Sequence, residues 1–280
     1  MSGRGSGRSG LLWLVGVVLV GGYLLVTTAL YLLQDALIFP AVPVPPPALA
    51  QEAERAGATV HHLTTSDGTR LLAWHVPRGG DRVLVWLHGN GGSITAVSWF
   101  ASQLPDWDVV GFSYRGYPGS DGQPSEAGLA QDADAVWEWL TTSLGFRPEQ
   151  VVLHAQSMGG GVASHLMSRS NPAGAVLDST FLSVEQLASE QYPWLPVRWL
   201  LRHPFRSDLR APEISVPVLV LHGDRDQVIP VDHGRTLATL YPNATYREVM
   251  GGRHDTWLLD EVESQHLWRQ FLSEVTASPR

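Results

Sequence analysis

A serine, an aspartate and a histidine occur in this chain where together they could activate a hydroxyl group. Ser157 follows the apolar run VVLHA, Asp226 lies in DRDQVIP, and His254 lies in GGRHDTW. A serine hydroxyl is a poor nucleophile unless a base removes its proton, and the base needs an oriented partner. Because all three residues follow predicted strands, in the order Ser, Asp, His, we expect Ser157 to attack, His254 to carry the proton and Asp226 to orient His254.

The backbone around Ser157 must hold its hydroxyl above the sheet. Many hydrolases place such a serine in the motif G-x-S-x-G, but this chain reads AQSMGGG, with Ala155 at the first glycine position and Gly159 at the second. Small residues are needed there because the strand and the helix approach closely. Ala155 adds only one methyl group, so we expect the turn to tolerate it.

The elements that position these residues alternate along the chain. Short apolar runs, typical of buried parallel strands, lie at residues 83–87, 108–114, 151–155, 173–179 and 217–223. Segments with helical spacing lie between them, including residues 126–144. Residues 59–77 resemble a hairpin that turns at Asp67 and Gly68. The pattern predicts an α/β fold with a mostly parallel sheet and an antiparallel pair at one edge.

The first part of the chain predicts a membrane anchor. Residues 11–33 carry no charge, and as a helix they would be about 35 Å long, enough for a hydrocarbon core of about 30 Å. A cleaved signal sequence is the alternative, but its apolar region is usually only about 7–15 residues long. Arg4 and Arg8 precede the span and Asp35 follows it, which predicts a cytoplasmic N-terminus (residues 1–10) and a catalytic domain on the other, periplasmic or extracellular, side.

Prolines then dominate residues 40–47, PAVPVPPP, and favour an extended spacer. We expect this spacer to cover residues 34–56 and a single catalytic domain to cover residues 57–280. The net charge of −8 and the lack of a dense basic run argue against nucleic acid as a partner. The absence of cysteine excludes a thiolate zinc site and a cysteine nucleophile. We expect no metal and no organic cofactor.

Six motifs in order carry a resemblance to a known family: LHGNGG, SYRGYPGSDG, AQSMGGG, LDSTF, HGDRDQVIP and GGRHDTW. With the anchor and QDALIFP, they resemble the α/β-hydrolases, and among these the membrane-anchored serine hydrolases with short lids, which include Bem46-type proteins and protein depalmitoylases. The resemblance implies an α/β-hydrolase fold with helices on both faces of the sheet and a short cap.

The resemblance also implies roles for individual residues. It assigns the acid to Asp226, three residues after the glycine of HG, with Asp224 as the alternative. It implies an oxyanion hole formed by the backbone N–H groups of Met158 and Asn90. Tyr114, Arg115 and Gly116 resemble the family's Y-R-G segment next to the site. From the residues themselves we expect instead that Arg115 pairs with a carboxylate and holds a turn, and that His88 braces its loop rather than transferring a proton.

The expected reaction is hydrolysis of an ester or thioester through an acyl-enzyme. The alternative enzyme is an aminopeptidase-like amide hydrolase. The alternative without enzymatic activity is a membrane-tethered binding protein that uses a hydrolase fold. Residues 184–212 leave room only for a short cap; their aromatic and basic side chains could form an acyl-chain-binding flap, contact the membrane surface, or simply pack as a helix pair. The expected partners are the lipid bilayer and an acylated small-molecule, lipid or protein substrate.

Overall fold

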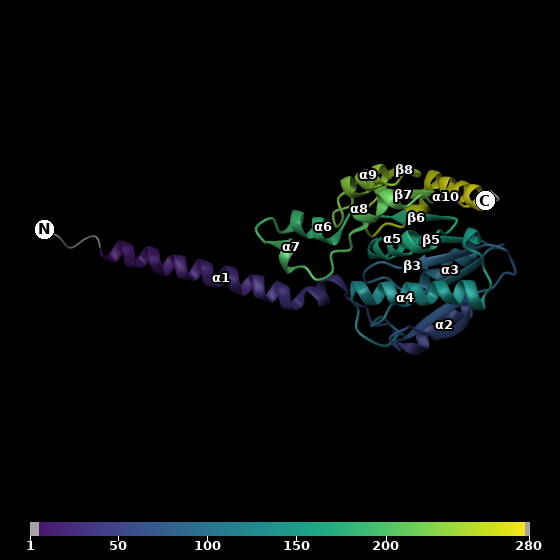
Figure 1. Cartoon of the computed structure of the whole chain (residues 1–280), viewed down its shortest axis with the longest axis horizontal. Helices are drawn as coiled ribbons and strands as arrows, with labels where there is room; N and C mark the ends of the chain where they lie inside the picture. The colour runs from purple at the N-terminus through teal and green to yellow at the C-terminus, as the bar shows by residue number, and fades with distance from the viewer. Residues whose placement is uncertain (1–5, 278–280) are drawn as a thin grey trace.

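A computed structural model describes residues 6–277, and the side chains from Gly10 onward. Of the predicted N-terminal segment, residues 1–5 lie outside the described part of the chain, as do residues 278–280 of the predicted domain. Figure 1 shows one long helix that projects from a layered domain, with the C-terminal helix on the far side of that domain.

The centre of the domain is an eight-stranded sheet in the order β1-β2-β4-β3-β5-β6-β7-β8. Its strands are β1 (Thr59–Thr64), β2 (Arg70–Val76), β3 (Val83–Leu87), β4 (Asp108–Phe112), β5 (Val151–Gln156), β6 (Gly174–Asp178), β7 (Val218–Gly223) and β8 (Ala244–Val249). The strands from β4 to β8 in this order are parallel, while β1 and β2 form the predicted antiparallel hairpin at one edge. The predicted fold class is therefore confirmed.

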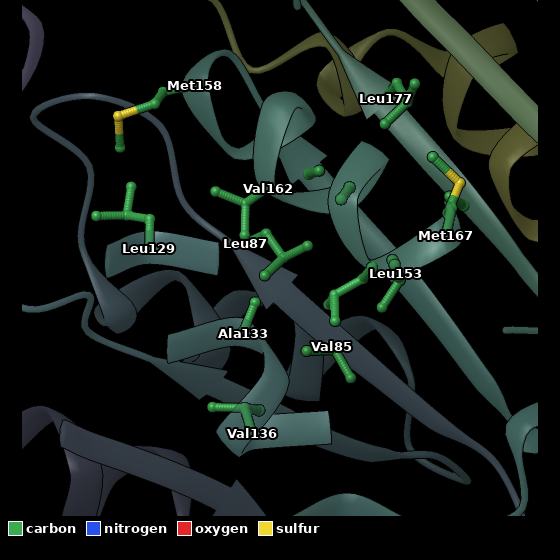
Figure 2. Close-up of a cluster of buried hydrophobic side chains, with 14 of the residues drawn as sticks. Val85, Leu87, Leu129, Ala133, Val136, Leu153, Met158, Val162, Met167 and Leu177 are labelled. Atoms are coloured by element: carbon green, nitrogen blue, oxygen red, sulfur yellow. The ribbon is translucent and has the colours of Figure 1, made fainter. Parts of the chain in front are cut away.

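Helices cover both faces because the strand residues alternate between two buried clusters. Val85 and Leu87 of β3 pack on one face, where Figure 2 shows them with Leu129 and Val162. Trp86 and its neighbour Leu84 pack on the opposite face. Strands that are apolar at every position, such as VLVWL, arise because both faces are buried in this way.

The longer helices of the domain are divided between the two faces of the sheet. The first face carries α4 (Glu126–Glu138), α5 (Met158–Ser170) and α9 (Val231–Leu240). The second carries α2 (Pro46–Ala56), α3 (Val97–Gln103) and α10 (Val262–Ala277). The helix predicted over residues 126–144 ends earlier as an α-helix, because residues Trp139–Ser143 continue it as a π-helical turn.

The N-terminal helix α1 spans Ser6–Ile38. Its segment Gly10–Ile38 is the one helix in the described chain that is long and apolar enough to cross a membrane. The predicted extended spacer is shorter than expected: the chain is irregular from Phe39 to Pro45, and α2 begins at Pro46. Proline is accepted there because the first turn of a helix needs no N–H donor.

Helix α2 belongs to the domain, since its Leu49 and Ala53 are buried in the cluster on the second face of the sheet, together with Leu84 and Trp86. The boundary expected at residue 57 therefore does not match the packing.

The cap is the short connection between β6 and β7, as predicted from the small number of residues that separate these strands in the sequence. It contains α6 (Val184–Gln191), α7 (Val197–Leu200) and α8 (Ser207–Arg210). In Figure 1, α6 and α7 lie at the end of the domain from which α1 leaves. Hydrogen bonds from Tyr23 and Gln34 of α1 to backbone oxygens of Trp194 and Leu200 join the helix to the cap.

Candidate active site

The candidate residues leave the sheet from one edge. Asn90 follows β3, Ser157 follows β5, Asp226 follows β7 and His254 follows β8. These strands run parallel, so their carboxyl ends lie side by side. In open α/β sheets this is the edge at which ligands bind.

Ser157 has a backbone conformation that side chains rarely adopt, with φ 51° and ψ −117°. Such strain persists only where the surroundings fix it. Here the Ser157 N–H donates to the Asp178 carbonyl oxygen at 2.9 Å, and the Ser157 carbonyl oxygen accepts from the Thr180 hydroxyl at 2.7 Å. The turn between β5 and α5 is thus held from both sides by the segment that follows β6.

The two glycines at the start of α5 are required because the backbone and side chains around them approach very closely. A Cβ atom at Gly159 would collide with the carbonyl oxygen of Leu87, and one at Gly160 would collide with the Thr180 side chain. Ala155 differs, because its methyl group points into the first buried cluster with no exposed surface. The departure from G-x-S-x-G at this position therefore fills core space and leaves the turn open.

His254 and Asp226 are in direct contact, with Nδ1 of the histidine 2.7 Å from Oδ2 of the aspartate. The other carboxylate oxygen, Oδ1, accepts the backbone N–H groups of Val228 and Ile229 at 2.8 Å each. Burial alone would raise the pKa of Asp226, but hydrogen bonds from His222, His254 and the Ile229 backbone hold it below its ordinary value. The carboxylate stays charged and fixes the orientation of the imidazole.

The alternative acid, Asp224, has a different position. Its Oδ1 accepts the backbone N–H of Gly251, and its own N–H donates to Val249. Asp224 therefore connects the loop after β7 to the loop after β8, which carries His254. Of the two aspartates, Asp226 is the one in contact with the histidine.

His222 is part of this arrangement, although no role for it was predicted from the sequence. It is fully buried, and its Nε2 lies 2.9 Å from the Ile229 carbonyl oxygen and 3.5 Å from Oδ2 of Asp226. Because the carbonyl oxygen only accepts, Nε2 carries the proton. The signal in the sequence is the spacing of four residues between the histidine of HG and Asp226.

Asp178 is a second residue that sequence reasoning missed as a site neighbour. It ends β6 and is buried, which raises its pKa to about 6, while the Ser179 hydroxyl and the charges of His222 and His254 act in the opposite direction. Its Oδ1 accepts from Ser179 at 2.8 Å. Asp178 therefore neighbours both the Ser157 turn, whose Ser157 N–H donates to its carbonyl oxygen, and the His254–Asp226 pair.

Asn90 and Met158 lie with Ser157 on the wall of one cavity. The loop that carries Asn90 approaches closely, since a Cβ atom at Gly89 would lie 3.1 Å from the Ser157 Cβ atom. His88 supports this loop: it is fully buried, and its Nδ1 lies 2.9 Å from the Gly89 carbonyl oxygen. Burial lowers the pKa of His88 to about 4, so at neutral pH it is an uncharged packing residue.

Arg115 has the structural role expected for it. Its guanidinium group bonds Asp132 at 2.8 Å and Asp67 at 2.7 Å, which ties the loop after β4 to α4 and to the hairpin turn. Among residues 6–277, no group of three or more histidine, cysteine, aspartate or glutamate side chains is arranged to hold a metal ion.

The family of this chain can be identified by comparison with known proteins. Residues 82–202 match the family model for the alpha/beta hydrolase fold. An uncharacterized protein of Mycobacterium tuberculosis is 36% identical over 221 residues, which cover 76% of this chain and 78% of that protein. An uncharacterized membrane protein of Saccharomyces cerevisiae is 29% identical over 269 residues, which cover 89% and 94% of the two chains.

A solved structure agrees at the level of the fold. The esterase Pf2001 of Pyrococcus furiosus superposes with a TM-score of 0.65 at 19% identity, over 84% of this chain and 97% of the esterase. At that identity the likeness concerns the fold alone. Together, the sheet order, the strained Ser157 turn and the extended match to the mycobacterial relative show that this chain belongs to the α/β-hydrolase superfamily.

Proposed function

We propose that this protein is a membrane-anchored serine hydrolase that cleaves an ester or thioester. The observation that supports this proposal most strongly is the strained Ser157, held at the same sheet edge as the paired His254 and Asp226. A strained serine at a strand-to-helix turn is the arrangement that exposes a nucleophile in this fold. Relatives of known fold include esterases, which agrees with acyl transfer to water.

In the proposed reaction, the Ser157 hydroxyl oxygen bonds to the substrate carbonyl carbon while His254 takes the hydroxyl proton. The bond between the carbonyl carbon and the leaving oxygen or sulfur then breaks, and His254 gives that proton to the leaving group. Water attacks the acyl-enzyme by the same route, which releases a carboxylic acid and restores Ser157. Asp226 orients His254 and stabilises the imidazolium form through its charge.

The oxyanion of each tetrahedral intermediate needs donors that are already in place. We assign this role to the backbone N–H groups of Met158 and Asn90, which border the cavity beside Ser157. Met158 begins α5, so its N–H belongs to the first turn of a helix, where backbone donors have no partner within the helix. The close approach of the Gly89 loop to Ser157 supports Asn90 as the second donor.

The proposed location follows from α1 and its flanks. Gly10–Ile38 would span the bilayer, with Arg4 and Arg8 on the cytoplasmic side and the catalytic domain on the other. A relative that covers most of the chain is described as a membrane protein, which supports membrane association.

The first test is covalent labelling of the full-length protein in detergent with a fluorophosphonate. Wild type should be labelled, whereas Ser157→Ala and His254→Ala should not, and both variants should lose esterase activity by several orders of magnitude while remaining folded. Ser168→Ala on the exposed side of α5 is the matched control and should react like wild type. Near-normal esterase activity in folded Ser157→Ala would contradict the proposal.

A further inference from the structure

A cavity of about 320 Å³ leads away from Ser157, within the range of about 300–1,000 Å³ of small-molecule sites. Its walls come from α1, from the cap and from the loop after Asp226. In the described chain, none of the residues that line it carries a charge, and most of them are aliphatic or aromatic. The chemistry of this space suits a hydrocarbon chain attached to a carbonyl group at Ser157.

One face of the anchor helix forms a wall of this cavity. Its lining residues recur at helical spacing: Thr27, Leu30, Tyr31, Gln34, Leu37 and Ile38. Leu32, on another face of the same helix, is 68% exposed. The same turns of α1 therefore face the cavity on one side and the surroundings, which in a membrane are lipid, on the other.

The cap runs along α1 rather than only touching its end. The Tyr23 hydroxyl donates to the Trp194 carbonyl oxygen at 3.3 Å, and the two rings meet edge to face with centroids 6.0 Å apart. Gln34, buried at the other end of the contact, donates to the Leu200 carbonyl oxygen and accepts the Arg202 N–H. From Tyr23 to Gln34 the helix rises about 16 Å, roughly half of a hydrocarbon core.

The exposed side of the cap is also unusually aromatic. Trp199 is 84% exposed and Trp194 is 48% exposed, and Arg198 lies exposed beside them. Tryptophan and arginine of this kind are favoured at the boundary between lipid headgroups and acyl chains. Because the cap lies against turns of α1 that are predicted to be inside the bilayer, this surface would meet lipid.

From these contacts we propose that the cap segment Tyr192–Trp199 inserts into the leaflet beside the catalytic domain, so that the cavity receives long acyl chains directly from the bilayer. The inference rests on the proposed serine hydrolase function and deepens it. The substrate class is an ester or thioester whose long acyl chain resides in the membrane. The anchor helix is then part of the substrate-binding surface.

The chain-length test uses the full-length protein in lipid nanodiscs, with p-nitrophenyl esters from butyrate to palmitate. Wild type should show a kcat/KM that rises with chain length. Leu30→Trp, which fills the cavity from the α1 side, should lower the palmitate-to-butyrate ratio of kcat/KM at least tenfold. Leu32→Trp adds the same ring to another face of the helix and should keep the wild-type ratio.

The same discs distinguish the two sources of such a chain. A phospholipid of the disc and an S-palmitoyl peptide added to the disc are offered as substrates in separate experiments. If wild type releases palmitate from one of them and Leu30→Trp releases less, the inference is supported and the source of the acyl chain is identified. Release from neither would overturn it. Equal kcat/KM for all chain lengths, in a protein that still hydrolyses butyrate through Ser157, would overturn the cavity assignment and leave the hydrolase proposal intact. Failed fluorophosphonate labelling would reject the hydrolase proposal itself.

Insertion of the cap is measured separately, and the absence of native cysteine makes single-site labelling simple. Trp199→Cys is labelled with an environment-sensitive fluorophore, and quenching by lipids that carry a nitroxide on the acyl chain is recorded. Strong quenching is expected. Ser273→Cys on α10, at the opposite end of the domain from α1 (Figure 1), should not be quenched. Equal, weak quenching at both positions would show that the cap stays outside the bilayer.

Discussion

At the scale of single residues, the candidate site combines residues that could be predicted from the sequence with residues that could not. Ser157, Asp226 and His254 could be predicted because each follows a strand and their order is informative. His222 and Asp178 could not, because their importance comes from neighbours that only the folded chain provides. His222 lies beside Ile229 and Asp226, and the carbonyl oxygen of Asp178 accepts the Ser157 N–H.

Asp178 leads to a prediction about stability and pH. Burial raises its pKa from 3.8 to about 6, so between about pH 4 and pH 6 the folded protein holds a proton that the unfolded chain has released. The free energy of unfolding therefore falls as the pH rises through this window. Asp178→Asn removes the effect, and its asparagine oxygen can still accept from Ser179.

The measurement is urea unfolding of wild type and Asp178→Asn at pH 4 and pH 7. Relative to wild type, the variant should gain about 2 kcal/mol between the two values of pH. Burial also raises the pKa of Asp132 to about 6, despite its contacts with Arg115. Because Asp132 is present in both proteins, its contribution to the free energy of unfolding cancels in the difference. Parallel stability curves for the two proteins would contradict the assigned pKa.

At the scale of elements, the apolar runs predicted the central strands because burial on both faces leaves an unbroken signal. The π-helical turn after α4 was not predicted, since hydroxyls of Thr141 and Thr142 bond back to carbonyl oxygens of the preceding turn, a local competition that periodicity does not record. Helix α2 was missed because its prolines favoured an extended chain, although they occupy its tolerant first turn.

The packing of α5 against β3 gives the prediction at this scale. Gly159→Ala places a Cβ atom against the Leu87 carbonyl oxygen, which is backbone and cannot move aside easily. We expect a loss of about 1–3 kcal/mol in the free energy of unfolding and a large fall in fluorophosphonate labelling, because the Ser157 turn must shift. Ser168→Ala, exposed on the same helix, should change neither quantity, and an unaltered labelling rate in Gly159→Ala would show that the close approach is dispensable.

At the scale of the whole molecule, α1 and the α/β domain are joined by hydrogen bonds and an ion pair. Gln34 is the central residue: its amide donates to the Leu200 carbonyl oxygen at 3.2 Å and its oxygen accepts the Arg202 N–H at 2.8 Å. Asp35 adds an ion pair with Arg202 at 3.0 Å and a hydrogen bond with His203 at 3.1 Å. The sequence predicted the helix, but its side-by-side packing with the cap depends on contacts over more than 160 positions of the chain.

Replacing Gln34 tests this connection. Gln34→Leu leaves the partly buried Leu200 carbonyl and Arg202 N–H without their side-chain partners, at a cost of about 0.5–1.5 kcal/mol for each lost hydrogen bond. Hydrogen exchange of the Arg202 amide should become at least tenfold faster in detergent. Leu33→Ala, on an exposed part of α1, should leave that rate unchanged; unchanged protection in Gln34→Leu would mean that the cap is held by the domain alone.

The two-sided use of α1 also affects how natural variation in this protein should be interpreted. Membrane anchors usually drift freely among apolar residues, and substitutions in them are treated as neutral. Here the turns from Thr27 to Ile38 border the cavity, so an exchange such as leucine for phenylalanine on that side would alter the shape of the proposed substrate cavity. Variants in α1 therefore belong with variants of the candidate active site when genotype is related to substrate range.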